Sequence, residues 1–220
     1  MENRNPQTAA ADLYHVLREQ KNPDLQQAID LALADNVFQK GLLDDLVSKN
    51  DTYRYNCFKV LLQISESQPQ VLYPQWDYFV GLLRSQNSYH RSIALRMLAN
   101  LTCIDQDNRF DSIFDQYFEM LDDEKIVTAR YLAQNAWKIA RSRPDLQGRI
   151  IQKLLSVEQT HFSQSQKDLL SADVIQSMNE LYESSPEKQA ILAFVEGRLN
   201  CSSPKTRQAA KAFLDRSTLP

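Results

Sequence analysis

Three stretches of the chain carry the same spacing of residue types, and this spacing constrains the fold more than any other feature of the sequence. In each stretch an arginine is followed after three positions by a small residue, and after six and seven positions by two apolar residues. The stretches are residues 53–61, 90–98 and 206–214. The second begins 37 residues after the first, and the third begins 116 residues after the second, close to three more steps of that size. A period in this range predicts a solenoid of stacked helix pairs.

The apolar residues of these stretches fall on one side of an α-helix. In the first stretch they occupy positions i, i+4, i+7, i+8 and i+11, which form the stripe that an amphipathic helix buries. Leu61 and Leu98 stand at equivalent positions of the first two stretches. We therefore expect both leucines to be buried between neighbouring helix pairs.

Glycine content supports an all-α fold. Strands and hairpins depend on turns that contain glycine, and only four glycines occur in 220 residues. Four dipeptides, Asn5-Pro6, Asn22-Pro23, Ser185-Pro186 and Ser203-Pro204, combine a capping side chain with a proline, which favours a helix start. With the apolar stripes they predict about six antiparallel helix pairs, at residues 6–20, 24–35, 37–49, 51–66, 71–84, 88–103, 109–121, 124–142, 145–157, 165–184, 186–199 and 204–216.

The repeated pattern resembles HEAT repeats, with armadillo repeats as close relatives. HEAT units have a proline in the first helix and an arginine early in the second. Tyr73-Pro74-Gln75-Trp76 is similar to the first feature, and three arginines stand at the second position: Arg54, Arg91 and Arg207. The resemblance implies one HEAT-like domain over residues 1–220, with about 1–36 as N-terminal cap helices and about 37–216 as repeats. It also implies that these arginines join adjacent repeats.

The sequence departs from the HEAT pattern in two respects. The aspartate that accompanies the arginine is replaced by asparagine or serine, at Asn50, Asn87 and Ser203. The fourth unit has no arginine in register around residues 126–129. We therefore do not expect a regular ladder of buried Asp–Arg pairs.

Several chemistries lack the residues that they need. No closely spaced glycines are present to cradle a phosphate, and the three histidines are solitary, which argues against a zinc site. Cys57 stands where the other stretches have alanine, so we interpret it as a buried thiol. His90 is interpreted as a hydrogen-bonded core or boundary residue, and the tryptophans Trp76 and Trp137 as helix packing. The sequence thus predicts no catalytic residues, no cofactor and no metal.

Charge is distributed unevenly between the predicted first and second helices. The second helices 88–103, 124–142 and 204–216 have net charges of +2, +3 and +3, whereas segment 105–123 has a net charge of −6. Second helices line the customary binding surface of such solenoids. The candidate partner-binding residues are basic and lie away from the apolar stripes: Lys59, Arg96, Arg130, Lys138 and Lys211. Ion pairing between the layer of first helices and the layer of second helices is an equally good explanation of these net charges.

We therefore expect a noncatalytic adaptor or scaffold that holds a protein partner through an acidic or extended segment. Two alternatives remain open. One is a nucleic-acid-binding protein similar to the HEAT-like DNA glycosylases that excise alkylated bases, although no motif of that family is matched. The other is a domain similar to helical-repeat tubulin-binding domains, which bind through loops along one edge.

The remaining composition bears on the compartment. Net charge is −3, and no apolar run approaches the length of a membrane span. The first eight residues are polar, unlike a secretory signal. Three widely separated cysteines fit free thiols in a reducing compartment. We expect a cytoplasmic protein that does not associate with membranes.

Overall fold

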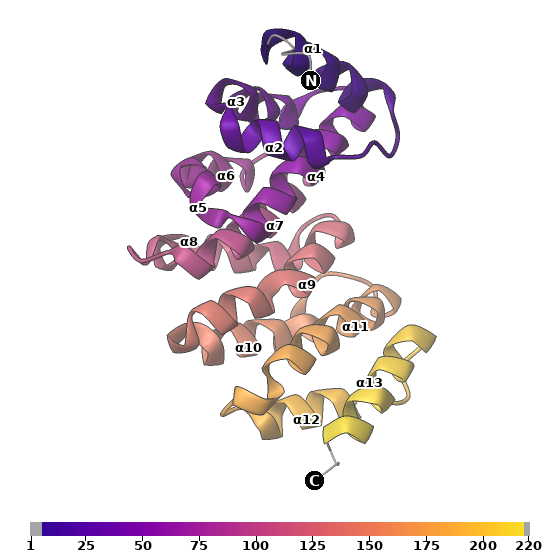
Figure 1. Cartoon of the computed structure of the whole chain (residues 1–220). Coiled ribbons are helices and arrows are strands. Elements are labelled where there is room, and N and C mark those ends of the chain that lie inside the picture. The colour runs from indigo at the N-terminus through magenta and orange to yellow at the C-terminus, as the bar shows by residue number, and fades with distance from the viewer. Residues whose placement is uncertain (1–5, 218–220) are drawn as a thin grey trace. The chain divides into compact units, whose positions relative to one another are not determined.

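The protein is helical throughout residues 6–217, the part that the computed structural model describes, and no strand occurs there. Figure 1 shows the helices in chain order. The chain divides into two compact units, residues 1–78 and 79–220, with the division inside α6 (Trp76–Leu82). The all-α class predicted from the sequence is confirmed.

The first unit contains four longer helices and a broken one. Its helices are α1 (Pro6–Glu19), α2 (Gln26–Ala34), α3 (Asn36–Asp44), α4 (Asp51–Ser67), α5 (Pro69–Leu72) and the start of α6. Helix α4 packs against α1, α2 and α3, and it carries the stripe of the first repeated stretch. In that stripe Cys57, Val60, Leu61 and Ile64 are completely buried.

The second unit alternates shorter and longer helices. They are α7 (Ser88–Leu101), α8 (Arg109–Glu119), α9 (Ile126–Ser142), α10 (Gln147–Leu155), α11 (Gln164–Leu181), α12 (Lys188–Glu196) and α13 (Pro204–Ser217). Helix α9 packs between α7 and α11, and α13 packs on the other side of α11. Leu98 on α7 is completely buried, as its register predicts, whereas Leu214 at the equivalent position of α13 is only half-buried.

Two predicted helix starts are displaced by local hydrogen bonding. Helix α2 begins at Gln26, because Asp24 accepts the Gln26 N–H at 3.0 Å. Helix α12 begins at Lys188, and Ser185 Oγ accepts the N–H of Glu187 at 2.9 Å. The start of α13 at Pro204 is confirmed, while Asn5 lies outside the described residues.

The predicted helix 71–84 is broken in the structure. It begins earlier, at Pro69, and the turn η2 (Tyr73–Gln75) separates α5 from α6. Pro74 explains the break, because proline donates no backbone hydrogen bond and clashes with the preceding turn. The polar segment after residue 158 is a connection, since α11 begins at Gln164, where Ser163 N donates to Gln166 Oε1 at 3.1 Å.

Candidate protein-binding surface on α7 and α9

Two of the predicted partner-binding residues lie on neighbouring helices of the second unit. The guanidinium of Arg96, on α7, lies over the ring of Tyr131, on α9, at 5.2 Å from its centroid. Lys138 Nζ, also on α9, donates to Asn100 Oδ1 on α7 at 2.7 Å. Both contacts cross from α7 to α9, so these two basic side chains belong to one local surface.

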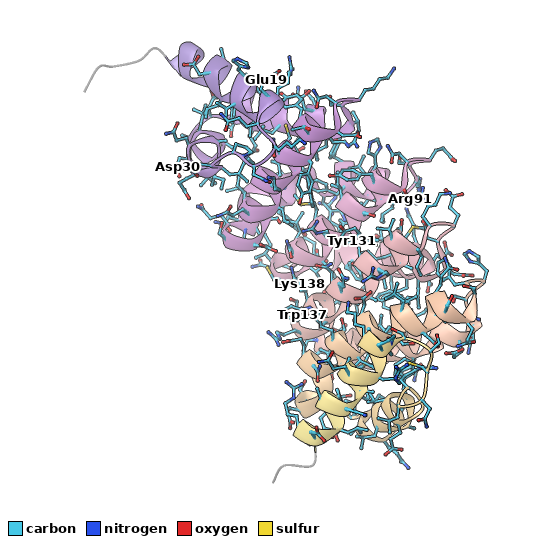
Figure 2. The ribbon with its side chains drawn as sticks, turned by 90° about the vertical axis from the view of Figure 1, so that its right-hand side faces the viewer. Glu19, Asp30, Arg91, Tyr131, Trp137 and Lys138 are labelled. Atoms are coloured by element: carbon cyan, nitrogen blue, oxygen red, sulfur yellow. The ribbon has the colours of Figure 1, made fainter. Side chains whose placement is uncertain are left out.

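The same face of α9 carries apolar and aromatic side chains that sequence reasoning did not select. Seven residues of α9 lie within about 120° of one another around a helix of 3.6 residues per turn. Arg130 and Gln134 donate to Asp173 of α11, and the other five are Val127, Tyr131, Trp137, Lys138 and Arg141. None of these five belongs to the buried core, and Val127 is 45% exposed. Together with Arg96 these five are called the α9 surface below. Figure 2 labels Tyr131, Trp137 and Lys138 on this part of the second unit.

Trp137 departs from its expected role. Trp76 is 1% exposed and fills the core, as predicted, but Trp137 is only half-buried, and the guanidinium of Arg141 lies 4.6 Å from its ring centroid. Arg141 also reaches Glu180 of α11 at 2.9 Å. This cation–π contact therefore involves a ring that keeps part of its surface in contact with solvent.

The other three candidates do not join this cluster. Arg130 lies on α9, but its Nε donates to Asp173 of α11 at 2.6 Å, and that carboxylate is 1% exposed. Lys211 is exposed on α13. Lys59 belongs to the first unit, where its amine lies 4.9 Å from the ring centroid of Tyr55.

The three repeated arginines make one identical contact. In each case Nη1 donates at 2.7 Å to a backbone carbonyl six residues earlier, from Arg54 to Ser48, from Arg91 to Ser85 and from Arg207 to Cys201. The accepting carbonyl lies in the connection that precedes the helix. The arginine therefore satisfies a carbonyl that the end of the previous element leaves without a helical partner.

Arg91 also forms a buried ion pair that the HEAT-like sequence pattern did not predict. Its Nε and Nη2 donate to the two oxygens of Asp123 at 2.6 and 2.8 Å, and both residues are buried. Asp123 lies before α9 and accepts the N–H of Lys125 at 2.8 Å, much as Asn87 accepts the N–H of Tyr89 before α7. One Asp–Arg rung is thus present, although the aspartate comes from the following helix pair.

The acidic segment 105–123 is not the uniform acidic surface that its charge sum suggested. Asp105 and Asp123 are buried, and Asp105 accepts the N–H of Phe110 at 2.8 Å at the start of α8. Asp111 pairs with Arg143 at 2.8 Å, and Asp122 lies 2.6 Å from His161. Pairing between successive elements therefore offsets much of the predicted charge separation.

Cys57 and His90, the two residues considered for catalysis, lie in structural environments that do not activate them. Cys57 is completely buried, and burial raises the pKa of its thiol to about 12, which leaves little thiolate for nucleophilic attack. His90 is half-buried, and its Nδ1 lies 3.0 Å from Ser85 Oγ. Within residues 6–217, no group of three or more His, Cys, Asp or Glu side chains is arranged to hold a metal ion.

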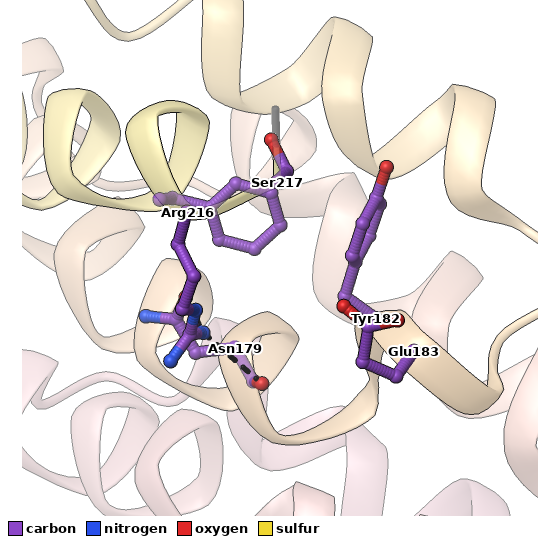
Figure 3. A pocket seen from close by; sticks show the side chains of 6 residues that line it. Asn179, Tyr182, Glu183, Arg216 and Ser217 are labelled. Carbon is purple, nitrogen blue, oxygen red and sulfur yellow. Dashed lines mark hydrogen bonds between the residues drawn. The ribbon is translucent and has the colours of Figure 1, made fainter. Parts of the chain in front are cut away.

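A small cavity lies between the ends of α11 and α13. Its volume is about 190 Å³, below the range of about 300–1,000 Å³ typical of ligand pockets. Figure 3 shows its lining, in which Arg216 donates to the side-chain oxygen of Asn179. The rings of Tyr182 and Phe213 meet edge to face at 5.2 Å. We therefore interpret this cavity as a packing gap between the two helix ends and not as a ligand pocket.

Comparisons with known proteins place this all-helical chain in no established family. No protein-family model matches the sequence, and no curated protein sequence matches it significantly. The crystal structure of an engineered protein from the Northeast Structural Genomics Consortium is similar, with a TM-score of 0.48 and 15% sequence identity over 97% of this chain and 91% of that one. No helix among residues 6–217 is long and apolar enough to cross a membrane.

Proposed function

We propose that the protein is a noncatalytic helical-repeat adaptor, HEAT-like in architecture and cytoplasmic, that binds an acidic segment of a protein partner on the α9 surface. The observation that carries this proposal is the row of aromatic and basic side chains on α9 that are not fully buried, two of which contact α7. Tryptophan, tyrosine and arginine are the residues most enriched where protein interfaces concentrate their binding energy.

The contacts on the α9 surface suit protein recognition. Tyr131 and Trp137 offer ring faces, and the cations of Arg96 and Arg141 are already ordered over them. Such pre-organisation lowers the entropy that binding would otherwise cost. A carboxylate of the partner can then accept hydrogen bonds from the Arg96 guanidinium without displacing it from the ring, whereas Arg141 is already paired with Glu180.

Nucleic-acid binding is less well supported, because ion pairs within the molecule already engage many basic side chains of the second helices. Arg91 pairs with Asp123, Arg130 with Asp173, and Arg141 with Glu180. Lys205 also lies 3.6 Å from Asp173. A phosphate backbone requires a continuous line of basic groups, and these pairs interrupt it.

The test is a pull-down from the source cell, followed by affinity measurements with each captured protein. The double reversal Arg96→Glu with Lys138→Glu, and separately Trp137→Ala, should weaken binding by about tenfold or more, as expected for central interface residues. The control is Lys21→Glu with Lys49→Glu, which reverses two exposed lysines of the first unit.

Three outcomes would oppose the proposal. The first is full affinity in both α9-surface variants. The second is loss of affinity only in the control. The third is tight binding of duplex DNA whose affinity falls steeply with salt, which would favour nucleic acid instead.

A further inference from the structure

A second surface feature lies entirely in the first unit and is independent of the α9 surface. It is a groove of about 680 Å³ between α3 and the broken helix α5–α6, and its size is that of a ligand site. Helix α3 forms one wall, at Asn36, Gln39, Lys40 and Asp44. The other wall includes Gln75.

Hydrogen bonds fix both walls of the groove. Gln39 is only 7% exposed, and its side-chain nitrogen donates to the carbonyl of Ala32 at 3.3 Å. On the opposite wall the hydroxyl of Tyr78 donates to the carbonyl of Leu43 at 2.8 Å, which ties α6 to α3. Two of the lining side chains are therefore held in place, and the groove is a formed feature of the first unit.

The polar groups of the groove match a peptide main chain. Asn36 and Gln75 are carboxamides, and each presents both a donor and an acceptor, as a peptide unit does, whereas Gln39 is buried and its side-chain nitrogen donates to Ala32. The wall from Asn36 to Asp44 is about 12 Å long at 1.5 Å per residue of helix. About four residues of extended chain, at about 3.3 Å each, span that length.

Charge selects the kind of peptide. Residues 1–78 contain seven Lys and Arg against eleven Asp and Glu, a net charge of −4. Asp44 is the last residue of α3, where the helix dipole adds negative potential, so a basic side chain is favoured there. Lys40 lines the groove one turn earlier and disfavours a second basic side chain at that point.

An exposed apolar residue extends the α3 wall. Val37 is 79% exposed, and it lies on the same face of α3 as Lys40 and Asp44, three and seven residues before them. A valine so exposed at the edge of a polar groove provides apolar contact for a peptide side chain leaving the groove.

We propose that the α3 groove binds a short extended peptide with a basic side chain placed at Asp44. The carboxamides hold its main chain, Asp44 selects the basic residue, and Val37 contacts an apolar neighbour. The groove is separate from the α9 surface, so the full protein has one site for an acidic segment and one for a basic segment.

The experiment uses a phage-displayed library of random peptides against the full-length protein. Selected sequences should be enriched in lysine or arginine, and their synthetic versions should bind when measured by titration calorimetry. Asp44→Lys should weaken binding by about tenfold, the loss expected for one charge-assisted hydrogen bond. Glu19→Lys on α1, an exposed residue with the same change in charge, should leave the affinity unchanged.

A second pair of variants tests the main-chain contacts. Asn36→Ala and Gln75→Ala should each weaken binding, and neither side chain belongs to the buried core, so both variants should fold. Circular dichroism of each variant establishes folding. Selection of no basic peptide, or equal affinity of the basic peptides for Asp44→Lys and Glu19→Lys, would each overturn the proposal, whereas acidic peptides in the same selection would be assigned to the α9 surface.

Discussion

The buried Arg91–Asp123 pair gives the sharpest prediction for stability. The side chains are 7% and 4% exposed, and two hydrogen bonds of 2.6 and 2.8 Å join them. Asp123→Asn keeps an oxygen that can accept the N–H of Lys125 but removes the buried carboxylate, so that the guanidinium keeps only the ion pair with Glu124, which is 3.3 Å away and 65% exposed. Removing one member of a buried pair costs about 3–5 kcal/mol, and we expect the lower end because asparagine still accepts a hydrogen bond.

The loss of stability in Asp123→Asn is measurable by both urea and thermal unfolding. For a chain of this size about 3 kcal/mol corresponds to a fall of roughly 6–12 °C in Tm. Asp123→Ala should cost about 1 kcal/mol more, since it also removes the contact to Lys125 N–H. The double variant Arg91→Met with Asp123→Leu should recover most of the loss, because it leaves no unpaired buried charge.

The matched control is the equivalent arginine of the first repeat. Arg54 pairs with Asp51 at 2.6 Å, but the Asp51 side chain is 87% exposed. Exposed pairs contribute about 0–1 kcal/mol, so Asp51→Asn should change the free energy of unfolding little. If Asp123→Asn were no more destabilising than Asp51→Asn, burial would not determine the strength of this contact and the reasoning would be refuted.

Three further predictions follow from burial and pKa. Leu98→Ala should lower the free energy of unfolding by about 2–5 kcal/mol in a urea titration, because the side chain is completely buried. A change within experimental error would contradict this prediction. In the native protein at pH 8, iodoacetamide should alkylate exposed Cys103 well before Cys57, whose thiol has a pKa of about 12, and mass spectrometry showing equal rates would contradict this. The hydrogen bond from Arg143 holds the pKa of the Asp145 carboxyl below its usual range, so the stability that it contributes is present above about pH 4 and is lost as the pH falls through the lower, folded-state pKa. Asp145→Asn should therefore flatten the dependence of Tm on pH in that acidic range, and an unchanged profile would oppose the assignment.

The helices of the repeated stretches could be predicted because their signals are local. The predicted ranges 51–66, 88–103 and 204–216 correspond to α4, α7 and α13 within a few residues, since a continuous apolar stripe and a capping residue define each one. The start of α2 was misplaced because two capping side chains, Asn22 and Asp24, compete in one short connection. Asp24 makes the bond to Gln26 in the structure.

The candidate sites depend on contacts between distant residues, which spacing does not show. Asp123 follows Arg91 by 32 residues, so a search four residues before the arginine, where HEAT repeats have their aspartate, misses it. Trp137 is interpreted as a packing residue from its apolar size, whereas its burial depends on how the neighbouring helices cover that face of α9. The α3 groove depends on the break at Pro74, and a single predicted helix over residues 71–84 gave no indication of it.

The position of Asp173 has a consequence for how the second unit opens. This buried carboxylate on α11 accepts from Arg130 and Gln134 of α9 and lies near Lys205 of α13. If α13 detaches, Asp173 still has Arg130 and Gln134 of α9 as partners. If α9 detaches, Asp173 keeps only Lys205. In native-state hydrogen exchange, the amides of α12 and α13 should exchange first and together, while those of α9 and α11 wait for unfolding of the whole unit. In the second unit, α12 and α13 are then the helices that first become accessible to a protease or a binding partner.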